Sequence, residues 1–193
     1  LNNNESTELD EHLRYNIELA GRFYSLSNGA YDITVKPLTD TWGFGRDLSA
    51  TNPNIDSLLE FVGYDLIAIN NNTLIKEDNR TQIDLNSIAK GYTVDVVAEE
   101  LETLGIVDYI VNIGGEIRCH GRNAQGKKWS IGIETPYDGN MEMDSIEKII
   151  EIESGALATS GNYRRVYLND EGEKIVHTID PRTGYSVTST LLS

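Results

Sequence analysis

The sequence has little cysteine, no long apolar run and none of the common zinc-binding spacings. Cys119 is the only cysteine in the chain, so an internal disulfide is excluded. Its alternating segment, EIRCHG, favours a small core residue over a reactive thiol. No apolar run approaches the roughly 18 residues that a membrane-spanning helix needs. No HxxxH or CxxC spacing occurs, which argues against a zinc site.

Positive charge is also scarce. Sixteen Lys and Arg residues stand against 31 Asp and Glu, a formal net charge of −15. Nucleic-acid binding needs clustered positive charge, so we expect no nucleic-acid partner. An anionic ligand would need local help from backbone amides, from a lysine or arginine, or from a metal ion.

The bulk composition is that of a globular protein. Hydrophobic residues make up 39% of the 193 residues and charged residues 24%, which is ordinary for a packed core. The length fits one large domain, or two small ones at a stretch. No composition shift or repeat marks a boundary, so we predict a single domain over residues 1–193.

Apolar spacing predicts two long helices. The first covers residues 7–27, with Ser6 or Thr7 as its N-cap, and the second covers residues 87–104. A shorter helix is expected over residues 54–62. Residues 39–53 lack periodicity and are interpreted as a loop.

Many short segments have extended character. The Asn71-Asn72 pair predicts a tight hairpin, and residues 123–126 and 169–172 also look like hairpin turns. Two long helices with many short strands predict an α+β fold on a largely antiparallel β-sheet core. The expected strands are residues 31–35, 65–70, 73–77, 81–85, 109–114, 116–121, 128–134, 148–153, 163–168 and 174–180.

The segment DLNSIAKG (84–91) combines a strand end with a helix start. Asp84 ends the strand, and Asn86 or Ser87 can cap the helix. The free N–H groups of the first helical turn suit a phosphate, and Lys90 adds a positive charge. A well-capped helix with a surface lysine would have the same sequence.

Two glycine-marked segments follow downstream. Gly114-Gly115 permits positive φ or close approach of a ligand to the backbone, although a β-bulge or tight hairpin would use the same pair. Neither a P-loop nor a GxGxxG fingerprint is present. In ATSGNYRR (158–165), Thr159 and Ser160 can line a pocket and Arg164 or Arg165 can pair with an anion; a plain strand–turn–strand would look similar.

HTIDPRTG (177–184) is the sharpest candidate for chemistry. His177 lies near a strand end and suits proton transfer near neutral pH, although a lone histidine is often structural. In an extended chain His177 and Asp180 face opposite sides, so we expect Asp180 to shape the following turn. His12 and His120 are interpreted as non-catalytic.

Four acids and one aromatic segment complete the candidates. The acids, which could supply oxygen ligands for Mg²⁺, are Asp32, Asp84, Asp95 and Glu116. The aromatic segment WGFG (42–45) either stacks on a ligand ring or plugs a core, and the core plug is favoured.

Together these segments resemble the ApbE family of flavin transferases. The matching pieces occur in the family's order and span most of the chain. They are NGAYDITVKPL (28–38), DTWGFG (40–45), QIDLNSIAKGYTVDVVAEEL (82–101), VNIGGEI (111–117), ATSGNYRR (158–165) and HTIDPRTGYSV (177–187).

The resemblance implies Mg²⁺-dependent transfer of FMN from FAD to a Ser or Thr hydroxyl of a target protein, with release of AMP. It implies that His177 is the base and that the backbone carbonyl of Ala89 is a magnesium ligand. Thr159 and Ser160 are expected to line the cofactor pocket. The flavin contacts carried over from the family are Ala30, Tyr31, Asp32, Asn86, Lys90 and Ile179.

The same resemblance implies ligands and partners outside the sequence. The remaining magnesium ligands are expected beyond Ser193, and an N-terminal strand is expected before Leu1, so we expect a chain truncated at both ends. Expected partners are acceptor proteins such as flavinylated subunits of bacterial respiratory redox pumps. A lipid-anchored, periplasmic or extracellular place in a bacterial cell envelope is also implied. An FAD pyrophosphatase and a non-catalytic FAD-binding protein remain alternatives.

Overall fold

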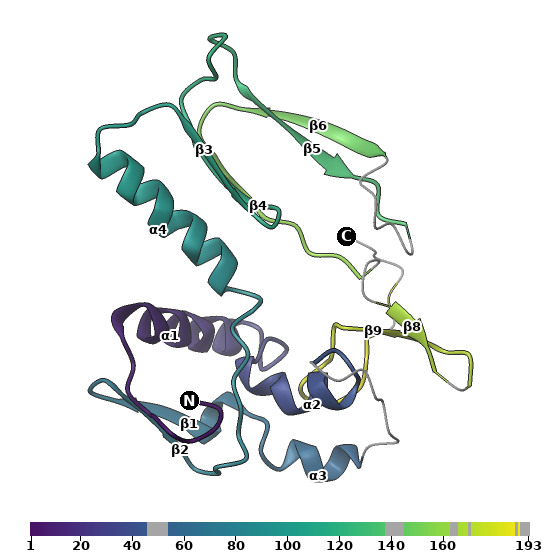
Figure 1. Ribbon diagram of the computed structural model, residues 1–193. Helices are drawn as coiled ribbons and strands as arrows, with labels where there is room; N and C mark the ends of the chain where they lie inside the picture. Colours follow the sequence, from purple (N-terminus) through teal and green to yellow (C-terminus); the bar gives the residue numbers. More distant parts are fainter. Residues whose placement is uncertain (46–53, 138–144, 163–165, 170, 188, 190–193) are drawn as a thin grey trace. The chain divides into compact units, whose positions relative to one another are not determined.

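The protein contains helices and antiparallel strands in two compact units (Figure 1). The structure is a computed structural model that describes residues 1–45, 54–137, 145–162, 166–169, 171–187 and 189. This mixture confirms the expected α+β class. Unit 1 comprises Leu1–Ser87 and Arg165–Ser189, and unit 2 comprises Ile88–Arg164 and Thr190–Ser193. The sequence shows no sign of this division, which falls inside the DLNSIAKG segment.

In unit 1 the first long helix starts later than predicted. Helix α1 (Glu11–Leu26) is capped by Asp10, whose carboxylate accepts a hydrogen bond from the Leu13 N–H at 2.8 Å. Ser6 and Thr7 are therefore not the cap. Residues 7–9 instead run beside a β-hairpin, because the Thr7 carbonyl accepts from the Leu74 N–H and the Leu9 N–H donates to the Asn72 carbonyl, both at 2.8 Å.

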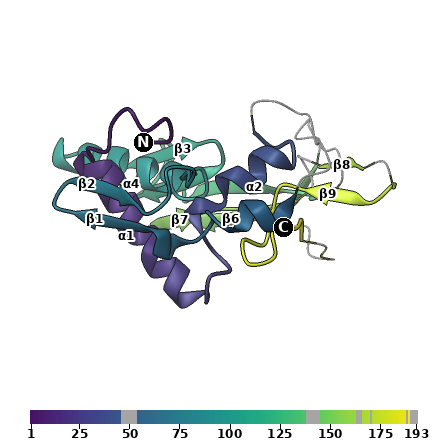
Figure 2. The same ribbon diagram turned by 90° about the horizontal axis from the view of Figure 1, so that it is seen from below.

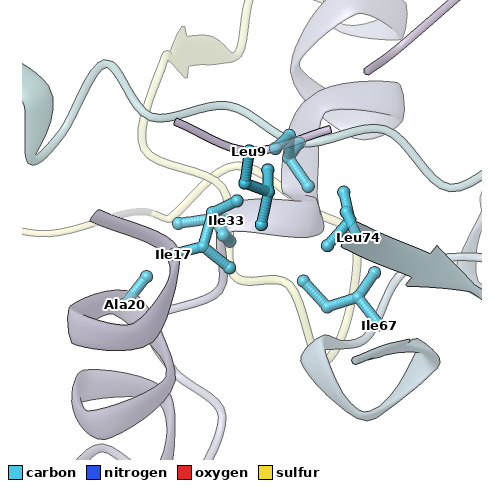
Figure 3. Close-up of a cluster of buried hydrophobic side chains, with 7 residues drawn as sticks. Leu9, Ile17, Ala20, Ile33, Ile67 and Leu74 are labelled. Atoms are coloured by element: carbon cyan, nitrogen blue, oxygen red, sulfur yellow. The ribbon is translucent and has the colours of Figure 1, made fainter. Parts of the chain in front are cut away.

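That hairpin is the one predicted around Asn71-Asn72. Strands β1 (Ile67–Asn70) and β2 (Thr73–Lys76) pair antiparallel, and Asn71 takes a φ of 55° in the turn. Helix α1 lies beside this hairpin in both views (Figures 1 and 2). Apolar side chains from this helix, from the hairpin and from three neighbouring segments form the main core of unit 1 (Figure 3). They are Leu9, Ile17, Ala20, Ile33, Ile67, Leu74 and Ile83.

The strand expected over residues 31–35 is helical instead. Ile33–Val35 forms a 3₁₀ turn that continues into α2 (Lys36–Thr41). The buried carboxylate of Asp32 accepts hydrogen bonds from the N–H groups of Thr34, at 2.8 Å, and Tyr64, at 2.9 Å. These bonds turn the chain at a point where its β-branched residues favour extension, and Pro37 suits the first turn of α2.

The segment over residues 81–85 is extended but is not a strand. Asn2 occupies its backbone groups, because the Asn2 side chain accepts from the Ile83 N–H and donates to the Ile83 carbonyl, both at 2.8 Å. The Asp84 N–H donates to the carbonyl of Ile33 at 2.7 Å. A side chain and a neighbouring turn therefore replace the expected partner strand.

A second core in unit 1 packs under α3 (Ile55–Leu59), which is shorter than the predicted helix over 54–62. Its buried residues are Leu38, Ile55 and Ile179. The predicted loop over 39–53 begins within α2, and residues 46–53 lie outside the described residues.

Strands β8 (Val166–Leu168) and β9 (Lys174–Val176) pair antiparallel. At the two ends of the predicted turn over 169–172, the Gly172 N–H donates to the Asn169 carbonyl at 2.9 Å, and residue 170 lies outside the described residues. Both strands are shorter than predicted. Residues 163–165 of the expected strand over 163–168 lie outside the described part of the chain.

In unit 2, helix α4 (Ala89–Thr103) packs on a three-stranded antiparallel sheet of order β3-β4-β7. The strands are β3 (Tyr109–Ile113), β4 (Glu116–His120) and β7 (Gly155–Leu157). The core between helix and sheet contains Val94, Ala98, Tyr109 and Val111. Strand β7, only three residues long, was not predicted.

Strands β5 (Trp129–Glu134) and β6 (Ile146–Ile152) form a separate antiparallel pair. The predicted turn over 123–126 is present, with the Gly126 N–H donating to the Asn123 carbonyl at 2.8 Å. It leads from one sheet to another instead of closing one hairpin, so that part of the prediction is wrong. In the described part of the chain, no helix has the length and apolar character needed to cross a membrane.

Candidate functional site

The DLNSIAKG segment forms a turn followed by the start of α4. The Asp84 carboxylate accepts a hydrogen bond from the Asn86 N–H at 2.7 Å, and residues 86–88 form the turn. The N-cap of α4 is Ile88, which makes no side-chain capping bond. Capping by Asn86 or Ser87 is therefore wrong. The reason is that Asp84 holds the Asn86 amide in a local turn, so that the helix begins only at Ala89.

The Gly114-Gly115 pair forms a tight hairpin turn between β3 and β4. Ile113 pairs with Glu116 across it, and the two glycines have φ values of 60° and 100°. A two-residue loop with positive φ at both positions is the glycine-rich hairpin turn of antiparallel strands. The Asn112 side chain accepts a hydrogen bond from the Gly115 N–H at 3.1 Å. Of the two readings of this pair, the hairpin is the one observed.

Lys90 connects these two segments within unit 2. Its Nζ lies 2.8 Å from the Oε2 of Glu116. A methyl group built on Gly114 would lie 3.6 Å from Cδ and 3.7 Å from Nζ of Lys90, so the lysine side chain lies over the turn. Two motifs that are separate in the sequence thus meet, and a cation is held beside a glycine turn.

In unit 1, Tyr31 meets the DLN segment. Its phenolic oxygen lies 3.0 Å from the Oγ of Ser87, and the ring of Phe23 contacts it edge-on at 6.0 Å. Burial raises the pKa of Tyr31, and the nearby Asp84 and Asp32 carboxylates add to this rise. The contact between Tyr31 and Ser87 brings the segment with the predicted flavin contacts Ala30, Tyr31 and Asp32 close to the turn that contains Asn86. Ala30 and Asn86 are exposed.

Asp32 is buried, and its carboxylate accepts hydrogen bonds from protein groups on both oxygens. Besides the two backbone bonds described above, it accepts a hydrogen bond from the Thr34 hydroxyl at 2.6 Å. Burial raises its pKa, and the bonds from Thr34 and Tyr64 act in the opposite direction. Its observed role is therefore to shape the turn before α2, and its contact with flavin stays a prediction.

His177 follows directly after β9 and is half-buried against an aromatic ring. The Phe44 ring meets the His177 ring edge-on, with centroids 6.1 Å apart. Tyr167 lies against the same phenylalanine at 5.6 Å and donates its hydroxyl to the Trp42 carbonyl at 2.7 Å. WGFG is therefore the predicted core plug. Its position beside the histidine was not predicted, and the only sequence signal was two aromatic residues, each followed by a glycine.

Asp180 shapes the turn that follows His177, as predicted. Its carbonyl accepts from the Thr183 and Gly184 N–H groups at 3.2 and 2.8 Å, and its carboxylate pairs with Arg182 at 2.7 Å. The hydrogen bonds from Arg182 lower the pKa of Asp180. Ile179 is buried in the second core, so its predicted flavin contact would have to use its backbone.

Three further candidates, Thr159, Ser160 and His120, lie in unit 2. Thr159 and Ser160 follow β7 and are exposed. Arg164 and Arg165 lie outside the described residues. The His120 Nδ1 hydrogen-bonds the Val107 carbonyl at 2.7 Å, and its ring stacks on Tyr109, in keeping with a structural role.

The four acids do not form a metal centre. Asp95 pairs with Arg118 and Glu116 pairs with Lys90. Across the described residues, no group of three or more His, Cys, Asp or Glu side chains could hold a metal ion. The Ala89 carbonyl accepts a hydrogen bond from the Thr93 hydroxyl at 2.7 Å. These residues do not make a complete magnesium site, and the role of Ala89 stays a prediction.

Sequence comparison identifies the family. The sequence model of the ApbE family matches residues 1–193. The chain is 40% identical over 181 residues to an FAD:protein FMN transferase of Vibrio cholerae, covering 92% of this chain and 53% of the relative. It is also 40% identical over 180 residues to one of Haemophilus influenzae, covering 89% of this chain and 51% of the relative. The chain belongs to the ApbE family.

Solved structures agree. The flavin transferase ApbE from Vibrio cholerae superimposes with a TM-score of 0.77 at 36% identity, covering 97% of this chain and 60% of that one. The ApbE protein of Thermotoga maritima superimposes with a TM-score of 0.80 at 32% identity, covering 95% of this chain and 59% of that one. The chain therefore spans only about half the length of the curated relatives it matches.

Proposed function

We propose that this protein is an FAD:protein FMN transferase. The observation that carries the proposal is the 40% identity over 181 residues with a Vibrio cholerae protein of that name. It is supported by two features of the chain itself: Lys90 held over a glycine turn at the start of α4, and the half-buried His177 against Phe44.

The proposed reaction is a phosphoryl transfer. A Ser or Thr hydroxyl oxygen of the acceptor attacks the phosphorus on the FMN side of the FAD pyrophosphate. The bond from that phosphorus to the bridging oxygen breaks, AMP leaves, and FMN remains on the acceptor as a phosphoester. His177 takes the hydroxyl proton, which is the work of a general base near neutral pH.

The protein groups would act mainly by positioning, as is usual in phosphoryl transfer. Lys90 would contact the anionic pyrophosphate of FAD. Mg²⁺ dependence is part of the proposal for the whole protein, and the metal would neutralise charge on the phosphates. Of the magnesium ligands that the family resemblance implies, the described residues contain only the Ala89 carbonyl.

The test is to incubate the full-length protein with FAD, Mg²⁺ and an acceptor domain that carries the family's target motif. We expect an acceptor band with flavin fluorescence on a denaturing gel. AMP formed equally well without acceptor, and no fluorescent band, would indicate a pyrophosphatase. Bound FAD with neither product would indicate a binding protein. Either result would overturn the transferase.

A further inference from the structure

We propose that Glu116 is a positioning residue for FAD binding, acting by holding the ammonium group of Lys90 in place over the Gly114-Gly115 turn. The inference rests on the proposed function, which makes Lys90 a contact of FAD. It adds a residue and a role: a carboxylate on β4 that fixes the lysine on α4.

The two partners of the Lys90–Glu116 ion pair differ in exposure. The Lys90 Nζ and Glu116 Oε2 atoms are 2.8 Å apart, and the Glu116 side chain is only 17% exposed while that of Lys90 is 48% exposed. The carboxylate is thus largely covered and its geometry is fixed by the sheet. The lysine remains open to solvent and to a ligand. An ordinary surface pair would leave both partners exposed and would hold neither.

Strand β4, which carries Glu116, is fixed to helix α4 at more than one point. Glu116 is the first residue of β4 and pairs with Ile113 across the two-glycine turn. On the same strand, Arg118 pairs with Asp95 and Glu102 of α4 at 3.2 Å each. Strand β4 therefore holds helix α4 at its first turn and again further along. Lys90 therefore pairs with a residue of β4, and the Arg118 ion pairs independently fix β4 to helix α4.

The surroundings of Gly114 and Gly115 differ. The Lys90 side chain passes close to Gly114, since a methyl group built there would be in ordinary van der Waals contact with its Cδ and Nζ, at 3.6 and 3.7 Å. Beside it, Gly115 is open, with no described atom within 4 Å of a methyl built at that position. The lysine is thus confined on the Gly114 side, and the adjoining surface is left free.

A held lysine binds an anion better than a free one. A free lysine chain must give up rotamer freedom when it meets a phosphate, and a chain already held by Glu116 has less to lose. The carboxylate also partly neutralises the ammonium, which acts in the opposite sense. Because the Lys90 side chain is half-exposed and nearby water weakens the charge effect, we expect the smaller loss of rotamer freedom to decide the affinity for FAD.

The test compares variants of the full-length protein by FAD titration and by transfer kinetics. We expect Glu116→Gln to raise the Kd and the KM for FAD about three- to tenfold with kcat within about twofold, and Glu116→Asp to lie between it and wild type. In a Lys90→Met background, Glu116→Gln should add no further loss, because its effect passes through the lysine. Glu99→Gln, which removes the same charge from an exposed position paired with Arg118, is the matched control and should not change the Kd.

Unchanged or tighter FAD binding in Glu116→Gln would overturn the proposal, as would an equal loss in the Lys90→Met background. Thermal melts identify a variant that fails to fold, and the Glu116→Asp cycle with Lys90→Met then decides. A wild-type protein that binds FAD without transfer contradicts the proposed function, yet its Kd values still test Glu116. Absence of FAD binding by the wild type contradicts both.

Discussion

The indole Nε1 of Trp42 donates a hydrogen bond of 2.7 Å to the carbonyl of Gly184, across 142 residues of sequence. This bond joins WGFG to the turn that follows His177. The neighbouring Phe44 lies against the His177 ring. The aromatic segment therefore contacts the histidine segment twice. Trp42 binds the turn after His177, and Phe44 packs on the His177 ring.

Replacing Trp42 with phenylalanine should destabilise this part of unit 1. The change removes the bond to Gly184 and leaves a partly buried carbonyl without its donor, so we expect the free energy of unfolding to fall by about 1–3 kcal/mol. Denaturant unfolding measures it. Trp129→Phe is the control, because the Trp129 indole bonds an exposed carbonyl of His120 at 3.1 Å. An equal loss in both variants would show that the Gly184 bond has no special weight.

Gly184 should not tolerate a side chain. Its φ is +76°, and a methyl group there would collide with Ile55 and lie 3.3 Å from Leu38. Backbone strain and overpacking together should cost about 2–5 kcal/mol in Gly184→Ala. Gly172→Ala has a similar φ of +80° but open space around it, and should cost only about 1–2 kcal/mol. Comparison of their thermal melts checks the difference, and similar melting temperatures would argue against the packing of Ile55 under the turn.

Arg118 should stabilise the docking of α4 on β4. It lies within 4 Å of the carboxylates of Asp95, Glu99 and Glu102, at 3.2, 3.7 and 3.2 Å. Arg118→Met leaves three neighbouring negative charges on one helix face, so we expect a loss of about 1–2 kcal/mol that shrinks in high salt. Lys36→Met, which breaks a single pair with Asp40, should cost less than about 1 kcal/mol. A loss at Arg118 that does not respond to salt would point to packing instead.

The Asp180–Arg182 pair should make stability depend on pH in a defined window. Arg182 holds the pKa of Asp180 below its ordinary value of 3.8 in the folded protein. The stabilisation is therefore fully present above pH 3.8 and is lost as the pH falls through the lower folded-state pKa. We expect Asp180→Asn to cost about 0.5–1 kcal/mol near neutral pH.

The difference from wild type should shrink below pH 3.8, the ordinary value for Asp180. Unfolding of wild type and Asp180→Asn, measured from neutral pH downward, gives this curve. Arg182→Gln should give a curve of the same shape, because it removes the same pair. A difference that grows in acid would contradict the assignment.

The parts of the fold that were predictable depend on local sequence. The Asn71-Asn72 hairpin is fixed by the residues in the turn itself. The strand predicted over 31–35 failed because the carboxylate of Asp32 binds the N–H of Tyr64, which is distant in sequence. The strand over 81–85 failed because Asn2 occupies its backbone groups.

The candidate site shows the same division. The roles of Asp180 in its turn and of WGFG in a core follow from residue types and were predicted. The contact between Lys90 and Glu116 depends on the β3–β4 hairpin turning back toward α4, and no local pattern records that. The start of α4 at Ala89 was also missed, because the Asp84 turn competes with helix formation.

The most direct test of the central claim is covalent modification of an acceptor by wild-type protein and by His177→Ala. Full-length protein is incubated with FAD, Mg²⁺ and acceptor, and mass spectrometry follows the acceptor while AMP is measured in parallel. We predict one FMN added per acceptor with equal AMP, FAD binding within about twofold in the variant, and transfer slowed at least about 100-fold in it. Unmodified acceptor with the wild type, or equal transfer by His177→Ala, would contradict the account.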